Sequence, residues 1–126
     1  MGKERVTKQD TINAVVPHIQ KLCINSDWLP DDIRTPVHKE TAHLLHVGDN
    51  DNTMILIDTR PGGNTGGCVH DYNTWSVIGS LIGHEANHIW QRLDDGSQHG
   101  YCELDRVNTI HLTPDQVCSQ PDTTIN

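Results

Sequence analysis

The pentapeptide HEANH at residues 84–88, an H-E-x-x-H motif, constrains the fold of this chain more than any other feature of its sequence. On an α-helix, residues four apart project from one face about a turn apart, so two imidazoles can bind the same tetrahedral metal ion. The glutamate beside the first histidine then leans over the open coordination position. The motif is the signature of a zinc hydrolase helix, and it predicts that His84 and His88 bind Zn²⁺.

The residues around the pentapeptide favour a helix that packs against a core. The three residues before it and the two after it are uncharged. At 100° per residue, the apolar side chains of this stretch cover one broad arc, and His84 and His88 fall at its border. We expect a helix from about residue 73 or 74 to residue 93, which ends at Asp94-Asp95-Gly96. The alternative is a buried amphipathic helix whose two histidines hydrogen-bond at the edge of the core.

A catalytic zinc site needs a third protein ligand and leaves its fourth position to water. The downstream candidates are Asp95, His99, Glu103, Asp105 and His111. Apolar spacing predicts a second short helix over about residues 101–112, and Glu103 lies at its start, after a turn that contains two glycines. We therefore predict Glu103 as the third ligand, with His99 as the second choice. The alternative is an ordinary first-turn glutamate stabilised by the helix dipole.

These residues predict the chemistry of a zinc-dependent metallopeptidase or amide hydrolase. Zinc held by His84, His88 and Glu103 polarises a scissile carbonyl and activates its bound water. Glu85 is expected to act as the general base that takes a proton from this water. Tyr101 is a further catalytic candidate, because its hydroxyl can stabilise an oxyanion near the proposed ligand. The expected partner is a protein or peptide substrate.

Length and charge limit the remaining function classes. The chain has 126 residues, enough for one domain with a modest core. We expect a flexible arm over residues 1–10, a single domain over residues 11–118 and a loose polar tail over residues 119–126. The net charge of -8 argues against nucleic acid or an anionic membrane as the main partner. The absence of an apolar leader or membrane-length stretch predicts a cytoplasmic protein.

Outside the motif, the sequence predicts a hairpin and a helix that is interrupted. Apolar runs at residues 43–47 and 53–58, separated by a Gly/Asp/Asn segment, predict an antiparallel β-hairpin. One of its two strands is our candidate for a free sheet edge that pairs with an extended substrate. Helical spacing over residues 12–22 is interrupted at Pro17, which should kink or end a helix. Residues 59–70 predict a loop, since they contain four glycines and a proline.

The four cysteines, Cys23, Cys68, Cys102 and Cys118, are too irregularly spaced for a C-x-x-C metal knuckle. Without a secretory signal, we expect free and mostly buried thiols. Cys68 and His70 form a C-x-H pair that can in principle add a metal ligand, but packing is the ordinary role of such residues.

The run from Ile82 to Gln91, with the apolar run Met54 to Ile57 upstream and an acidic segment downstream, resembles small zincin-like proteins encoded by bacteriophages and prophages. Their pattern is approximately H-E-A-x-H-x-W-Q followed by a glutamate-containing helix. The resemblance covers about residues 40–110. It implies an α+β fold, a minimal zincin-like domain with a small antiparallel sheet, an active-site helix and a ligand-bearing helix. It also implies a phage context, in the bacterial host cytoplasm or in the virion.

This resemblance leaves the third ligand open, and two alternative functions remain. The stretch from Tyr101 to Asp105 departs from the more acidic family pattern, so Glu103, His99 and Asp105 all stay candidates. A zincin-fold virion or assembly protein can keep its metal for stability without turnover. The segment from Ile57 to Gly62, with residues 67–69 and the Trp75-led stretch, is similar to the SUKH superfamily of partner-binding immunity proteins, which implies a binding module without metal.

Overall fold

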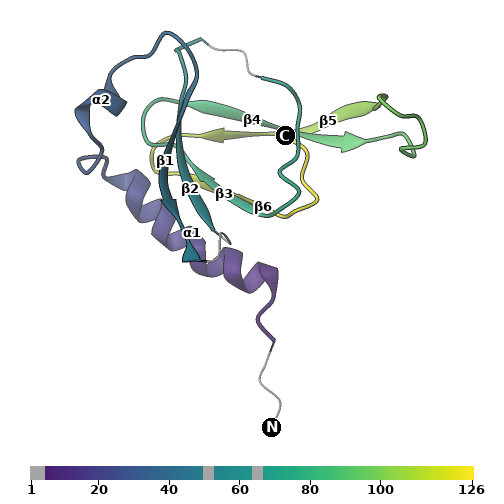
Figure 1. Ribbon diagram of the computed structural model, residues 1–126, viewed down its shortest axis with the longest axis horizontal. Helices are drawn as coiled ribbons and strands as arrows, with labels where there is room; N and C mark the ends of the chain where they lie inside the picture. Colours follow the sequence, from purple (N-terminus) through teal and green to yellow (C-terminus); the bar gives the residue numbers. More distant parts are fainter. Residues whose placement is uncertain (1–4, 50–52, 64–66) are drawn as a thin grey trace. The chain divides into compact units, whose positions relative to one another are not determined.

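The computed structural model describes residues 5–49, 53–63 and 67–126. Within these ranges the chain forms two helices and six strands, and the strands pair into three antiparallel two-stranded sheets (Figure 1). The chain divides into two compact units, of which Met1–Ser26 with Cys68–Asn126 form the first and Asp27–Gly67 the second. Neither helix of the described ranges combines the length and the apolar character needed to cross a membrane.

Both helices predicted around the metal motif are wrong. Strands β3 (Ser76–Gly79) and β4 (Glu85–Arg92) occupy the stretch expected to be the active-site helix. Strand β5 (Leu104–Leu112) occupies the stretch expected to be the ligand-bearing helix. The zincin-like α+β fold is therefore contradicted, because its two functional helices are absent and the described chain is mainly β-structure with one long helix.

The local sequence explains why strands form where the motif predicted a helix. Gly79 and Gly83 lie inside the predicted helix, and each glycine costs a helix interior about 1 kcal/mol relative to alanine. Gly83 has a φ of 83°, which is outside the helical region and ends any continuous helix here. The β-branched side chains of Val77, Ile78 and Ile89 favour strands. The H-E-x-x-H spacing carried no information about these backbone preferences.

Helix α1 (Lys8–Ile24) in the first unit begins at a capping box. The Thr7 hydroxyl accepts a hydrogen bond from the Asp10 N–H at 3.1 Å, and the Asp10 carboxylate accepts one from the Thr7 N–H at 3.0 Å. The bond from the Thr7 backbone holds the pKa of Asp10 below its usual value. The helix continues through Pro17, where we expected a kink or an end.

The core of the first unit lies where α1 packs on the sheet of β3 and β6 (Val117–Gln120). Ile12 and Cys23 of α1, Leu112 of β5 and Cys118 of β6 are buried. Gly79 in β3 lies directly beneath Cys23, because a Cβ built on this glycine would overlap Cys23 Sγ. Close packing of helix on strand therefore requires glycine here. All four cysteines are free thiols, two buried and two exposed.

The C-terminal segment, which we expected to be loose, is hydrogen-bonded into the first unit. Ser119 and Gln120 belong to β6, and Gln120 is buried. The Trp90 N–H donates to the carbonyl of Ile125 at 2.8 Å. His70 and Asn126 exchange two backbone hydrogen bonds of 2.7 and 2.9 Å. These bonds satisfy backbone N–H and C=O groups of the segment, and its polar composition does not predict them.

The second unit contains a short helix α2 (Asp31–Arg34) and the predicted hairpin, which is confirmed. Strands β1 (Thr41–Val47) and β2 (Met54–Thr59) pair antiparallel, with a bulge between Leu44 and His46. Of the connection, residues 50–52 lie outside the described residues. The predicted loop follows β2, and its residues 64–66 lie outside them too.

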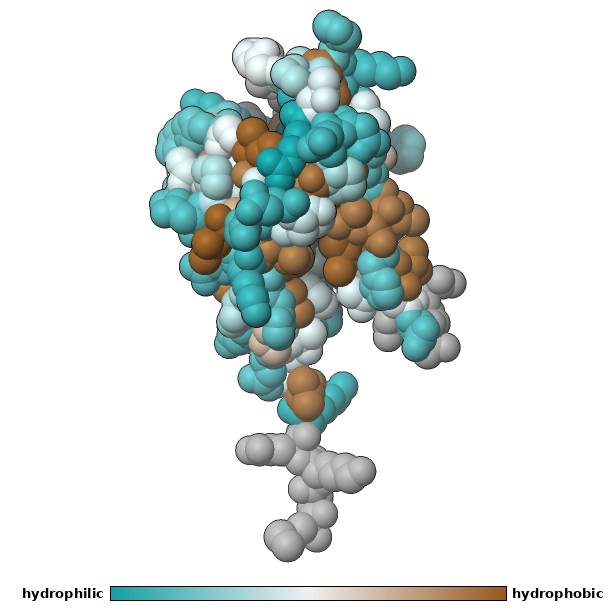
Figure 2. Space-filling view, turned by 90° about the vertical axis from the view of Figure 1, so that its left-hand side faces the viewer, coloured by the Kyte–Doolittle hydropathy of each residue, from teal (hydrophilic) through white to brown (hydrophobic). Residues whose placement is uncertain are grey.

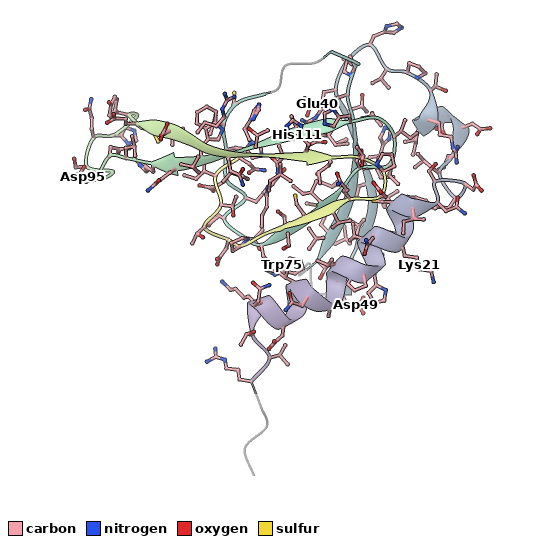
Figure 3. The ribbon with its side chains drawn as sticks, turned by 180° about the vertical axis from the view of Figure 1, so that it is seen from behind. Lys21, Glu40, Asp49, Trp75, Asp95 and His111 are labelled. Carbon is pink, nitrogen blue, oxygen red and sulfur yellow. The ribbon has the colours of Figure 1, made fainter. Side chains whose placement is uncertain are left out.

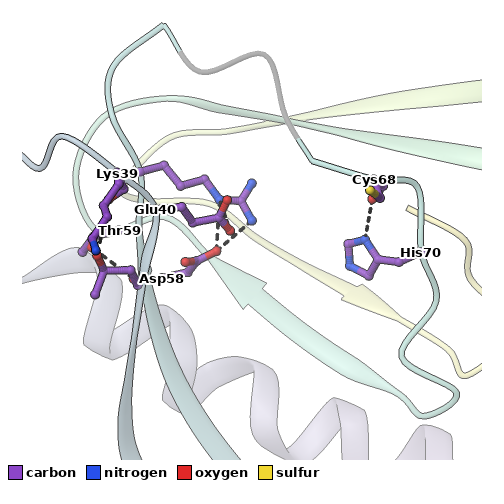
Figure 4. A network of polar contacts seen from close by, with 8 residues as sticks. Lys39, Glu40, Asp58, Thr59, Cys68 and His70 are labelled. Atoms are coloured by element: carbon purple, nitrogen blue, oxygen red, sulfur yellow. Dashed lines mark hydrogen bonds and ion pairs between the residues drawn. The ribbon is translucent and has the colours of Figure 1, made fainter.

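Ion pairs tie together the open end of this hairpin. The Arg60 guanidinium lies 2.7 Å from an Asp58 carboxylate oxygen and 3.3 Å from a Glu40 carboxylate oxygen (Figure 4). The Thr59 hydroxyl donates to the Thr41 carbonyl at 3.1 Å. These contacts connect β2 to the residues that lead into β1, so they help to close a hairpin that a turn alone stabilises only marginally.

We predict that Gly79→Ala destabilises the protein. The added methyl group would overlap Cys23 Sγ and would lie 3.2 Å from Ile19 Cγ2, and overpacking of this kind costs about 1–3 kcal/mol. Chemical denaturation should therefore show a lower midpoint. Gly62→Ala is the control, because nothing lies within 4 Å of its Cβ position. Cys23→Ala should partly rescue Gly79→Ala in a double-mutant cycle; an unchanged midpoint for Gly79→Ala would contradict this packing.

Candidate functional site

Strand β4 separates the two histidines that a helix would have brought together. Four residues span about 6 Å along a helix axis but about 13 Å along a strand. Zinc bonds to nitrogen are only about 2.0–2.1 Å long, so His84 and His88 cannot share one ion. Across the residues that the structure describes, no group of three or more His, Cys, Asp and Glu side chains is arranged to hold a metal.

Glu85 points away from His84, because successive side chains of a strand alternate between faces. Asn87, on the same face as Glu85, is buried, and its amide donates to Cys118 Sγ at 3.8 Å. Burial raises the pKa of the Cys118 thiol, and the charge of Glu85 raises it further. Glu85 therefore lies on the Cys118 side of the strand, where it cannot activate water bound at His84.

Glu103 and Tyr101 lie at the opposite end of the β4–β5 hairpin from His84. In the register Glu85 pairs with Leu112 and Arg92 pairs with Leu104, so Glu103 is about nine strand positions, or roughly 30 Å, from His84. The same end carries Asp95 and His99, and Asp105 follows shortly in β5. Figure 3 shows Asp95 at the tip of the hairpin and His111 well back along it. The structure does not bring the predicted catalytic and third-ligand residues to the motif.

The loop between β4 and β5 is organised around Asp94. Its carboxylate accepts hydrogen bonds from Arg92 Nε at 2.9 Å and Nη2 at 2.8 Å. It also accepts bonds from the backbone N–H groups of Gly96 and Glu103, both at 2.9 Å. The Arg92 bond, followed by these backbone bonds, holds the pKa of Asp94 far below its usual range. Tyr101 contributes its carbonyl, which accepts from Arg92 Nη2 at 3.2 Å. The hydrogen bonds of Asp94 therefore stabilise the turn of the β4–β5 hairpin.

Pairing of β4 with β5 brings His84 to a different histidine. His84 Nε2 lies 3.1 Å from His111 Nδ1, and the two rings are stacked with centroids 5.1 Å apart. Both side chains are exposed. His111 was one of several downstream candidates, but we did not choose it, because only the strand register places it diagonally across from His84.

We call His84, Ala86, His88, Thr109 and His111 the histidine face. Ala86 pairs with His111 and His88 with Thr109, so these residues share the outer side of the β4–β5 sheet. His88 Nδ1 lies 3.0 Å from Thr109 Oγ1 and takes no part in the His84–His111 pair. No member of the face carries a carboxylate or a permanent positive charge. The face therefore offers imidazole nitrogens as metal ligands.

The separation of the two nitrogens suits bidentate metal binding. Two donors that each lie about 2.0–2.1 Å from an ion and 3.1 Å from each other subtend an angle of about 100° at the ion. Tetrahedral and cis square-planar geometries have angles close to this value. Both rings must rotate, because the nitrogens of this pair face each other, whereas each bond to the ion would lie about 40° from the line that joins the two nitrogens.

An open depression of about 350 Å³ lies beside His111. Residues of α1, β5 and the turn before β6 line it, namely Val16, Gln20, Ile110, His111, Leu112, Asp115, Gln116 and Val117. Asp115 is the carboxylate of this set, and its side chain accepts a hydrogen bond from the Thr113 hydroxyl at 2.7 Å. Because α1 residues and the buried Leu112 line it, this depression lies on the side of β5 opposite to the histidine face.

Two other predicted features are placed elsewhere. His70 Nδ1 lies 2.9 Å from the backbone carbonyl oxygen of Cys68, so the contact involves the Cys68 backbone and not its thiol (Figure 4).

The edge-strand candidates form an exposed apolar face on the β1–β2 hairpin, which consists of Leu44, Val47, Met54 and Leu56. Figure 2 shows hydrophobic side chains gathered in patches on the surface. Pairing of this hairpin with an extended substrate stays a prediction.

Comparison of the chain with protein-family models, with curated proteins and with solved structures gave no match. The resemblances to phage zincin-like proteins and to the SUKH superfamily stay predictions from the sequence. The geometry of the histidine face is therefore the feature from which a function is inferred.

We predict that Asp94→Asn makes the protein less stable at neutral pH and makes its stability less dependent on acid. The pKa of Asp94 is lower in the folded state, so its stabilising contribution is present above the unfolded-state pKa of about 3.9 and is lost as pH falls through the folded value. Thermal melts between pH 7 and pH 2 measure this change. Asp105→Asn removes the same charge from the same hairpin and is the matched control; equal pH profiles for Asp94→Asn and the wild type would contradict the prediction.

Proposed function

We propose that the protein binds a divalent transition-metal ion, with Zn²⁺ as the first candidate, through His84 Nε2 and His111 Nδ1. The observation that carries the proposal is the 3.1 Å separation of these two nitrogens. Imidazole is a ligand that Zn²⁺, Cu²⁺ and Ni²⁺ all accept. Protein metal sites of these ions commonly use histidines from neighbouring elements.

The surrounding structure supports such a site. His111 lies within β5, and His84 directly precedes β4, so the hydrogen-bonded ladder between the two strands limits their relative movement. A pair of ligands that is already close loses less conformational freedom on binding than two free side chains would. Because both rings are exposed, an ion can reach the nitrogens from solvent without opening the fold.

This proposal keeps the zinc expected from the sequence but changes its second ligand from His88 to His111. It includes no hydrolysis. A zinc hydrolase needs a base beside the metal-bound water, whereas Glu85 is on the opposite face of β4. Glu103, the ligand expected to complete the centre, is roughly 30 Å away along the hairpin. Binding is therefore the function that the arrangement supports.

The decisive experiment compares three substitutions on the same face. We predict that His111→Ala and His84→Ala each weaken Zn²⁺ binding by at least about tenfold, since loss of even an indirect partner of a metal ligand often costs this much. His88→Ala should retain wild-type affinity. Isothermal titration calorimetry on the full chain measures the affinity, in a Cys68→Ser, Cys102→Ser background that removes the exposed thiols as competing ligands.

A ligand set of the H-E-x-x-H type predicts the opposite ranking, with loss of binding in His88→Ala and retention in His111→Ala. That result would reject the site proposed here, as would the absence of Zn²⁺ binding by the parent protein. Circular dichroism spectra of the variants confirm that each is folded. The three substitutions lie on one exposed or half-exposed face, so their effects on stability should be small and similar.

A further inference from the structure

We infer that a second copy of this chain completes the metal site, so that one ion joins two histidine faces. The inference rests on the proposed function, because it needs His84 and His111 as ligands. It identifies the partner of the site as the protein itself and the product as a metal-bridged dimer with four imidazole ligands.

The number of ligands is the first reason. Zn²⁺ in closed sites is bound by four ligands in a tetrahedron, and one chain supplies two of them. No third His, Cys, Asp or Glu joins the pair to form a metal-holding group anywhere in residues 5–49, 53–63 and 67–126. A two-fold axis through the ion would place a second His84–His111 pair on the open side, and two-fold symmetry is the commonest symmetry of protein dimers.

The shape and charge of the histidine face are the second reason. His84, Ala86 and His111 are exposed. Ala86 pairs with His111 on the same face, and its side chain is only a methyl group. None of the five residues of the face is a carboxylate, so the face itself adds no negative charge where two copies would meet. Each chain carries a net charge of -8, and two copies repel each other elsewhere. A divalent cation between the faces opposes this repulsion.

The small size of the face makes the association depend on the metal. A stable protein interface uses about 20–30 residues on each side, whereas the histidine face has far fewer. Contacts between the two faces alone should therefore not hold the dimer together. Removal of the ion should return the protein to monomers.

Asp115 is the competing ligand within one chain. It follows His111 by four residues in the chain, and its carboxylate accepts a hydrogen bond from the Thr113 hydroxyl at 2.7 Å. If that carboxylate turned toward the ion, a single chain would supply three ligands and would not need a partner. Asp115→Asn distinguishes the two arrangements, because it removes the competing carboxylate and leaves both histidines in place.

The test combines sedimentation velocity with a zinc titration, using the full chain in the Cys68→Ser, Cys102→Ser background. We expect a monomer in EDTA, a dimer with Zn²⁺ and a stoichiometry of one ion per two chains. Addition of EDTA to the dimer should restore the monomer. His84→Ala and His111→Ala should stay monomeric with Zn²⁺, and Asp115→Asn should dimerise like the parent protein.

The outcomes separate this inference from the proposed function. A monomer that binds one Zn²⁺ per chain through His84 and His111 overturns the dimer and leaves the proposed function intact. A monomeric site that weakens in Asp115→Asn identifies that carboxylate as the third ligand and likewise overturns the dimer. No binding by the parent protein overturns both. A dimer that persists in EDTA overturns the bridging role of the metal.

Discussion

The antiparallel pairing of β4 with β5 is the interaction on which the candidate site depends. Its register runs from Glu85 opposite Leu112 to Arg92 opposite Leu104, and it places every histidine of this region. Through it His84 meets His111, while His88 lies beside Thr109. Because side chains alternate across the strand, the same pairing sends Glu85 to the other face. A shift of register by one residue would remove the imidazole pair altogether.

The rest of the first unit holds this hairpin in place. Leu112 at the end of β5 is almost fully buried, and the C-terminal segment hydrogen-bonds β4 at Trp90. Helix α1 covers β3 and β6, with Gly79 allowing close approach of the helix. At the far end, Asp94 connects Arg92 to the backbone of Glu103 and so closes the turn. Polar residues that are typical metal ligands are used there to build the loop.

An acidic chain with two exposed histidines close together is a chemically consistent setting for a cation. The net charge of -8 attracts divalent ions to the surface in general, but dispersed carboxylates give no selectivity for one place. Two imidazole nitrogens 3.1 Å apart add that selectivity, because transition metals prefer nitrogen donors. Ca²⁺ and Mg²⁺, which take oxygen ligands, are correspondingly poor candidates for this pair.

The sequence by itself determined the elements that depend on neighbouring residues. The β1–β2 hairpin was predictable because two apolar runs flank a turn-forming segment. The start of α1 follows from the Thr7 and Asp10 capping pattern, whose signal we did not use. The motif at residues 84–88 identified His84 as a candidate ligand, but spacing alone does not state which backbone carries it. Gly79 and Gly83 were local evidence against a helix.

Tertiary structure alone decided which side chains meet. The partner of His84 is 27 positions away in sequence, and no periodicity within either strand specifies the register between them. The same holds for the tail, where Ile125 and Asn126 hydrogen-bond the backbones of Trp90 and His70. The physical reason is that helices form from contacts within a few residues, whereas sheets form from pairings between distant segments. Sequence therefore indicated a possible ligand, and the pairing of two strands selected its partner.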